Sequence, residues 1–128
     1  MRTMLLSAAL GAALLSPVAA HALTAYADET LTVHAGPGAN FPALEQLGPE
    51  TRLWVHGCRQ EHDWCDVSHG RMRGWVRSDR LAVSGGGTVE IPVATFDIRA
   101  YWDENYRREA FYADLATWEA GRQVAEGR

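Results

Sequence analysis

Lysine is absent from this chain, and its basic side chains are outnumbered by acidic ones. The 128 residues include 12 basic residues, all of them arginine, against 16 acidic residues, giving a formal net charge of −4 at pH 7. Nucleic acids and anionic lipid surfaces attract proteins that carry an excess of positive charge. The composition therefore predicts no nucleic-acid partner and no anionic membrane as the main partner.

The chain also lacks a hydrophobic run long enough to span a bilayer, which needs about 20 apolar residues. Met4–Leu15 is shorter and suits the hydrophobic region of a secretory signal, which Pro17 would end. Small side chains at Ala20 and Ala22 fit signal peptidase. We expect residues 1–22 to be a signal peptide cleaved after Ala22, with Ala20 as the alternative site. The product would be periplasmic or secreted, with no membrane span; a buried N-terminal helix is the less favoured alternative.

Cysteine is scarce, since Cys58 and Cys65 are the only two. In an exported protein, an even pair this close in sequence is most simply a disulfide bond. Closing so short a loop is expected to stabilise the fold by about 2–3 kcal/mol. In a regular antiparallel ladder, direct pairing of the two cysteines would set Val55 opposite Ser68 and mismatch the apolar sides. A one-residue bulge at Gly57 would resolve the mismatch.

Catalytic motifs are missing. The sequence contains no G-x-S-x-G, H-E-x-x-H or G-x-G-x-x-G pattern, and Gly85–Gly87 lacks the Lys-Ser/Thr of a phosphate loop. A nucleophile pair of Cys65 and His62 would need a reduced cysteine. Three aspartates show no pairing that would poise a carboxyl group as an acid: Asp63, Asp66 and Asp79. We therefore predict a protein that is not an enzyme and needs no cofactor.

One region contains residue types that bind zinc. His56, Cys58, His62 and Cys65 lie within ten residues of one another. Their spacing matches no common zinc finger or knuckle, and oxidised cysteines cannot bind the metal. A metal or redox protein is therefore a weaker alternative, and we predict no metal site.

Short strands separated by turns are expected between residues 23 and 83. Alternation of residue types places Leu31 and Val33 on the same face of one expected strand. In another, Leu53 and Val55 share a face and Trp54 lies on the opposite face. Gly70 suits a turn that needs a positive φ. The expected strands read TAYA, LTVH, PALEQL, TRLWVHGC, WCDVS, RGWVR and LAV. Such a series is typical of a small all-β barrel.

The segment HAGPGANFP is expected to form a rigid turn between two of these strands. Gly36 and Gly38 permit backbone angles that other residues resist, and Pro37 fixes φ between them. Pro42 favours an extended conformation at Phe41. The turn would therefore hold an aromatic ring at its far end.

The composition changes after Val83. We interpret residues 84–95 as a Gly-rich linker and an extended segment, which Pro92 confines to an edge or an isolated extension. Residues 96–128 have helical spacing, with Asp97 as a cap and Gly121 as a stop. Seven aromatic residues are too many for this tail to bury alone: Phe96, Tyr101, Trp102, Tyr106, Phe111, Tyr112 and Trp118. We expect the tail to lie on the barrel, with a second copy or a partner protein as alternatives.

The order of these elements resembles the bacterial SH3 (SH3b) domain family. The matching segments, LTVHAGPG, QLGPETRLWV, DWCDV and RGWVRSDRL, lie between Ala25 and Leu81. The tail, with its FDxxxYWxxxY pattern, resembles an extension that follows the SH3b domain in some secreted proteobacterial proteins. The resemblance implies a small SH3-like β-barrel at residues 23–83, with a short helical extension at 96–128. It also implies binding of short peptides, including cell-wall peptide stems or bridges.

Aromatic residues on the outer face of such a barrel would line a shallow groove. Four residues are candidates for this ligand-binding groove: Phe41, Trp54, Trp64 and Trp75. We predict a non-catalytic binding module for peptidoglycan or for a peptide segment of a cell-envelope protein. The alternative is a structural or interaction protein whose groove is covered by its own C-terminal helices.

Overall fold

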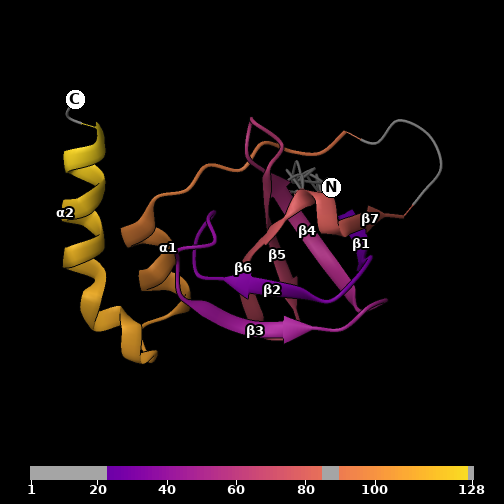
Figure 1. Cartoon of the computed structure of the whole chain (residues 1–128), viewed down its shortest axis with the longest axis horizontal. Helices are drawn as coiled ribbons and strands as arrows, with labels where there is room; N and C mark the ends of the chain where they lie inside the picture. Colours follow the sequence, from indigo (N-terminus) through magenta and orange to yellow (C-terminus); the bar gives the residue numbers. More distant parts are fainter. Residues whose placement is uncertain (1–22, 85–89, 127–128) are drawn as a thin grey trace, which may run out of the picture.

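The chain forms an antiparallel β-sheet followed by helices that lie on one side of it (Figure 1). The computed structural model describes residues 23–84 and 90–126; the predicted signal peptide and Gly85–Gly87 lie outside the described residues. The strands are β1 Leu23–Ala27, β2 Leu31–His34, β3 Ala43–Leu47, β4 Arg52–Cys58, β5 Trp64–His69, β6 Met72–Arg77 and β7 Leu81–Val83. Their order in the sheet is β3-β2-β6-β5-β4-β1-β7. All seven expected strands are confirmed, as is the turn at Gly70, whose φ is 59°.

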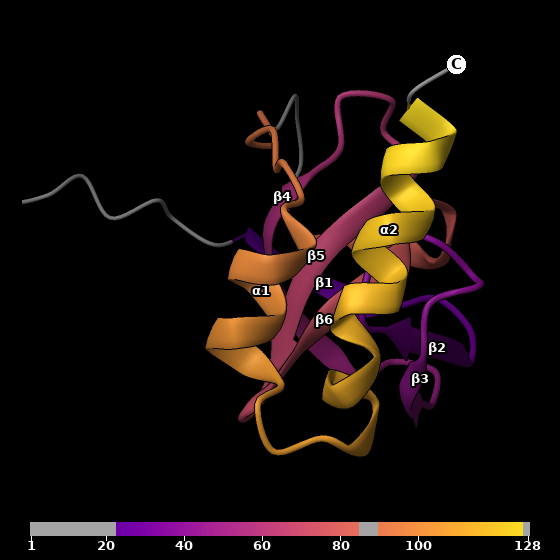
Figure 2. The same ribbon diagram turned by 90° about the vertical axis from the view of Figure 1, so that its left-hand side faces the viewer.

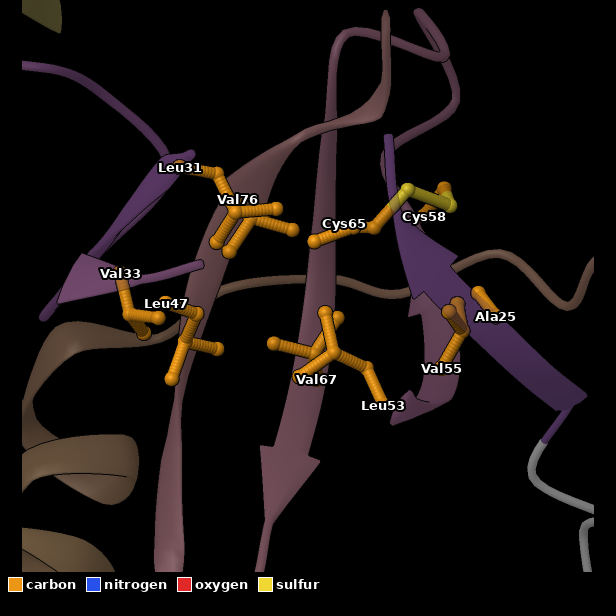
Figure 3. Packing of buried hydrophobic residues seen from close by; sticks show 11 residues of the cluster. Ala25, Leu31, Val33, Leu47, Leu53, Val55, Cys58, Cys65, Val67 and Val76 are labelled. Atoms are coloured by element: carbon orange, nitrogen blue, oxygen red, sulfur yellow. A yellow bond between two sulfur atoms is a disulfide. The ribbon is translucent and has the colours of Figure 1, made fainter. Parts of the chain in front are cut away.

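The sheet curls around one hydrophobic core (Figure 3). Leu47 of β3 and Ala25 of β1 are far apart in the strand order, yet both belong to this core, so the sheet must bend to bring them together. Leu31, Val33, Leu53 and Val55 are buried, as their alternation predicts. Burying each such side chain contributes about 1.5–3 kcal/mol. The chain is thus mainly β, with a helical extension.

The hairpin of β4 and β5 carries the disulfide bond. Cys58 and Cys65 are paired directly across the two strands and bonded to each other, which confirms the prediction. Val55 lies opposite Val67, and the register shifts between Val55 and Gly57, so the expected bulge is present but is displaced by one residue from Gly57. His56 is the extra residue that restores the match between apolar sides.

The turn after β2 is built differently from the expectation. Among the glycines of the described residues only Gly70 has a positive φ, so the turn does not use the backbone freedom that Gly36 and Gly38 permit for a positive φ. Instead, a Cβ at Gly36 would lie 2.6 Å from the Phe41 ring, and one at Gly38 would lie 3.2 Å from it. Because these two glycines have no side chain, the ring of Phe41 can pack directly against the backbone of the turn.

The extended segment before the helices crosses the disulfide-bonded hairpin. The amide of Cys58 donates to the carbonyl of Pro92 at 2.9 Å, and the amide of Ala94 donates to the carbonyl of Cys58 at 2.8 Å. These bonds make an isolated parallel bridge between Cys58 and Val93, a pairing that the sequence did not predict. A Cβ at Gly57 would lie 2.9 Å from the Pro92 carbonyl oxygen, so this crossing requires glycine there.

Two α-helices complete the described chain and lie side by side over the sheet (Figure 2). Helix α1 is Ile98–Asn105, a 3-10 turn η2 is Ala110–Asp114, and helix α2 is Leu115–Glu126. The carboxylate of Asp97 accepts from the Ala100 amide at 3.1 Å, which confirms the predicted cap. The predicted stop at Gly121 is wrong, because α2 continues through it to Glu126. Within the described part of the chain, neither helix has the length and apolarity that crossing a bilayer requires.

Candidate functional site

The four aromatic residues expected in one groove do not lie together. Trp75 is fully buried, and its ring packs against Phe96 and Tyr101 at centroid distances of 5.6 and 5.9 Å. Phe41 is also buried and stacks on Trp118 of α2 at 4.7 Å, with an angle of 14° between the rings. The expectation that these two rings are open to a ligand is therefore wrong for this conformation, because the tail covers both.

Trp54 lies apart from the others. Its side chain is 42% exposed on β4, and the guanidinium of Arg52 lies 4.9 Å from its ring centroid. It pairs with Thr24 of β1 on one side and with Ser68 of β5 on the other. Trp54 does not line the cavity that adjoins Trp64, so the two indoles do not share a groove.

Buried polar bonds hold the tail on the sheet. The hydroxyl of Tyr101 donates to the carboxylate of Asp66 at 2.6 Å, and Arg73 donates two bonds to the same carboxylate at 2.8 and 2.7 Å. Tyr106 donates to the carbonyl of Arg73 at 2.7 Å. Burial, and then the negative charge of Asp66, raise the pKa of Tyr101, so its hydroxyl stays protonated and can donate. Specific hydrogen bonds therefore hold the tail over Trp75.

Trp64 is the remaining candidate, and it lies at the start of β5. Its side chain is partly exposed beside a cavity of about 200 Å³. The cavity is lined by Thr30, Leu31, Thr32, His34, Ala39, Trp64, Arg77 and Arg80. The ring of His34 meets the indole edge-on, with centroids 5.7 Å apart. We call this the Trp64 groove.

Strand pairing and turn contacts place the polar groups of the Trp64 groove. Trp64 and Arg77 lie directly opposite each other on β5 and β6, so their side chains share one face of the sheet. The amide of Ser78, the residue after Arg77, donates to the carbonyl of Asp63 at 2.9 Å. The Nδ1 atom of His34 lies 2.9 Å from the Phe41 carbonyl oxygen; a carbonyl only accepts, so Nδ1 carries the proton.

The described residues offer neither an assembled catalytic triad nor a metal site. His56 Nε2 lies 2.8 Å from Ser68 Oγ, and burial, followed by the positive charge of Arg73, lowers the pKa of His56. The nearby carboxylate of Asp66 bonds to Arg73 and Tyr101 instead of orienting the imidazole. No group of three or more His, Cys, Asp or Glu side chains in the described residues could hold a metal ion. The two cysteines of the zinc and thiolate alternatives are joined in the disulfide.

No family model, curated protein or solved structure matches this chain. The assignment of function therefore depends on the groove itself and on the residues that line it.

The sequence did not predict Arg77, Arg80 and His34 as parts of this groove. The signal for Arg77 was present, because a turn centred on Gly70 and Arg71 sets Trp64 opposite Arg77 in a regular hairpin. No comparable signal existed for His34, which reaches Trp64 from another strand.

Proposed function

We propose that this protein is an exported, non-catalytic binding module that engages a cell-wall peptide, or a peptide segment of a cell-envelope protein, through the Trp64 groove. Its curled sheet would be an SH3-like barrel of the SH3b type, as the order of the sequence motifs implies. The disulfide bond agrees with export to a periplasmic or extracellular space, where such bonds persist.

One observation carries this proposal. Trp64 is partly exposed and lines a cavity that also presents hydroxyl, imidazole and guanidinium groups, whereas Phe41 and Trp75 are buried and Trp54 does not line this cavity. A partly exposed indole offers a large, rigid contact area at low entropic cost, and the polar groups beside it can orient a ligand. Such a surface suits binding, and nothing in its lining is arranged to transform a substrate.

Sedimentation with isolated peptidoglycan sacculi tests the proposal. We expect the purified chain to co-sediment with sacculi and Trp64→Ala to reduce the bound fraction about tenfold, as loss of a central aromatic contact does. Trp54→Ala is the matched control, since Trp54 is exposed on the same sheet but lies outside the groove. Equal binding by the Trp64→Ala variant and the original chain would contradict the assignment of this groove.

The second candidate is a structural or interaction protein whose groove is covered by its own helices. The burial of Phe41 and Trp75 beneath the tail favours it. If the tail only masks a binding surface, the full chain should not sediment with sacculi, and deletion of residues 88–128 should restore sedimentation.

We expect the opposite result for that deletion. Removing the tail would expose Trp75 and Phe41 and leave the buried carboxylate of Asp66 without its Tyr101 donor. The shortened chain should therefore bind a hydrophobic dye and lose its cooperative unfolding transition.

A further inference from the structure

The Trp64 groove has an uneven distribution of charge. Both ionised side chains that line it are positive, Arg77 and Arg80, whereas the whole chain carries a net charge of −4. The acidic partners of these arginines, Asp79 and Glu29, are not part of the lining. The lining therefore contains two arginines and no acidic residue, and each guanidinium group is paired with an acid that lies outside the lining.

Both arginines are held in place by acidic side chains that do not line the groove. Arg77 donates to Asp79 from Nε at 3.2 Å and from Nη2 at 2.8 Å. Arg80 pairs with Glu29 at 2.6 Å, and its Nε lies 3.8 Å from the same Asp79. Asp79 thus keeps the two guanidinium groups next to each other. These pairs are exposed and add little stability, but each guanidinium has five N–H donors and keeps several for a ligand.

The backbone fixes the distance between the aromatic and the charged parts of the groove. Trp64 and Arg77 are paired across β5 and β6, where opposite side chains stand about 5 Å apart at Cβ. The carbonyl of Arg80 accepts from the amide of Asp28 at 2.8 Å, which anchors the second arginine. The cavity of about 200 Å³ is smaller than the roughly 300–1,000 Å³ of common small-molecule pockets, so it suits the end of a chain.

We propose that the Trp64 groove binds the free C-terminal carboxylate of a peptide. The carboxylate would lie between Arg77 and Arg80, and the side chain of the terminal residue would pack on the indole of Trp64. Guanidinium and carboxylate groups match in geometry and charge, which makes such hydrogen bonds strong. This inference rests on the proposed peptide-binding function and specifies the chemical group that the site recognises.

The test compares three short peptides in titrations of the full chain. They are acetyl-Ala-Ala-Leu with a free carboxylate, the same peptide as its C-terminal amide, and acetyl-Ala-Glu-Leu amide. Binding is followed through the indole N–H resonance of Trp64 in NMR spectra, assigned with the Trp64→Phe variant. We expect the free acid to bind at least about tenfold more tightly than either amide, and added salt to weaken it.

Variants separate this inference from a general effect of charge. Arg77→Gln and Arg80→Gln should each reduce affinity for the free acid about tenfold and leave the weak binding of the amide unchanged. Arg107→Gln is the control, because Arg107 is an exposed arginine outside the groove. The dispersion of the amide resonances reports whether each variant is folded.

Three outcomes would overturn the inference while leaving the peptide-binding function intact. If the free acid and its amide bind with equal affinity, the groove does not recognise a carboxylate. If the Glu-containing amide binds as tightly as the free acid, the groove recognises a carboxylate but does not require it to be at the C-terminus. Failure of all three peptides, with Trp64-dependent binding to sacculi retained, would also overturn it. Loss of the sacculus binding would instead contradict the proposed function.

Discussion

Tyr101 of α1 donates a hydrogen bond to Asp66 of β5 at a distance of 2.6 Å, across 35 residues of sequence. Arg73 of β6 holds the same carboxylate through two further bonds, so one buried acid joins two strands to the helical tail. The ring of Tyr101 also packs against Trp75. This junction explains why the tail belongs to the fold and why Trp75 is covered.

Removal of the Asp66 charge should destabilise the protein strongly. Asp66→Asn leaves Arg73 without its ion-pair partner, which we expect to lower the free energy of unfolding by about 3 kcal/mol. Tyr101→Phe removes one hydrogen bond and should cost about 1–2 kcal/mol. Urea unfolding followed by circular dichroism measures both losses.

Two exposed positions serve as controls for that comparison. Asp79→Asn and Tyr26→Phe change the same side-chain types at the surface, and each should stay within about 0.5 kcal/mol of the original chain. A loss in Asp79→Asn as large as that in Asp66→Asn would refute the central role of the buried acid.

Stability should fall on the acid side of neutrality because of His56. Burial, and then the charge of Arg73, lower the pKa of His56 below its ordinary value of 6.5, against the attraction of Asp66. The unfolded chain therefore takes up this proton more readily than the folded chain. The contribution of His56 to stability is complete above pH 6.5 and is lost as the pH falls towards its folded pKa.

Thermal unfolding between about pH 7.5 and about pH 5 tests this dependence. Tm should decrease across the interval, and His56→Gln should flatten the decrease while His69→Gln leaves it unchanged. A decrease of the same size in the His56→Gln variant would assign the effect to other groups.

The disulfide bond should contribute measurably to stability. Its loop closes over a sequence separation of 7, for which chain entropy gives about 2.5 kcal/mol. The double variant Cys58→Ser, Cys65→Ser should be destabilised by about that amount in denaturant unfolding. A reducing agent should lower the denaturation midpoint of the original chain to that of the variant and leave the midpoint of the variant unchanged. If the reducing agent also shifts the midpoint of the variant, the loss of stability has a cause other than the disulfide bond.

Substitution of Gly57 should disturb the crossing of the tail segment. A Cβ there would lie 2.9 Å from the Pro92 carbonyl oxygen and 3.0 Å from the Ala94 side chain. We expect Gly57→Ala to destabilise the fold by about 1–3 kcal/mol. It should also speed hydrogen exchange at the amide of Ala94, which bonds to Cys58.

Gly48→Ala is the matched control for this experiment. A Cβ at Gly48 would meet nothing within 4 Å, so its stability and the exchange rate at Ala94 should stay near those of the original chain. Identical behaviour of the two alanine variants would show that the crossing tolerates a side chain.

The seven strands, the disulfide, the bulge beside Gly57 and the Asp97 cap could all be predicted because their causes are local. Alternation, turn residues and capping act over a few positions, and the paired cysteines sit within one hairpin. Gly121 shows the limit of such signals. A glycine can end a helix but does not have to, and α2 continues past it.

The candidate site was predicted only in part. The sequence identified the aromatic residues but could not separate Trp64 from Trp75, because both stand in strands beside similar neighbours. Only the tertiary structure decides which of them the tail covers. One of the contacts that position the tail is a hydrogen bond of 2.9 Å from Trp102 Nε1 to the carbonyl of Ala35, which lies 67 residues away in the sequence. Burial and charge at a site depend on segments distant in the chain. Sequence periodicity determined the strands and their faces, whereas long-range packing determined which outer face remains open.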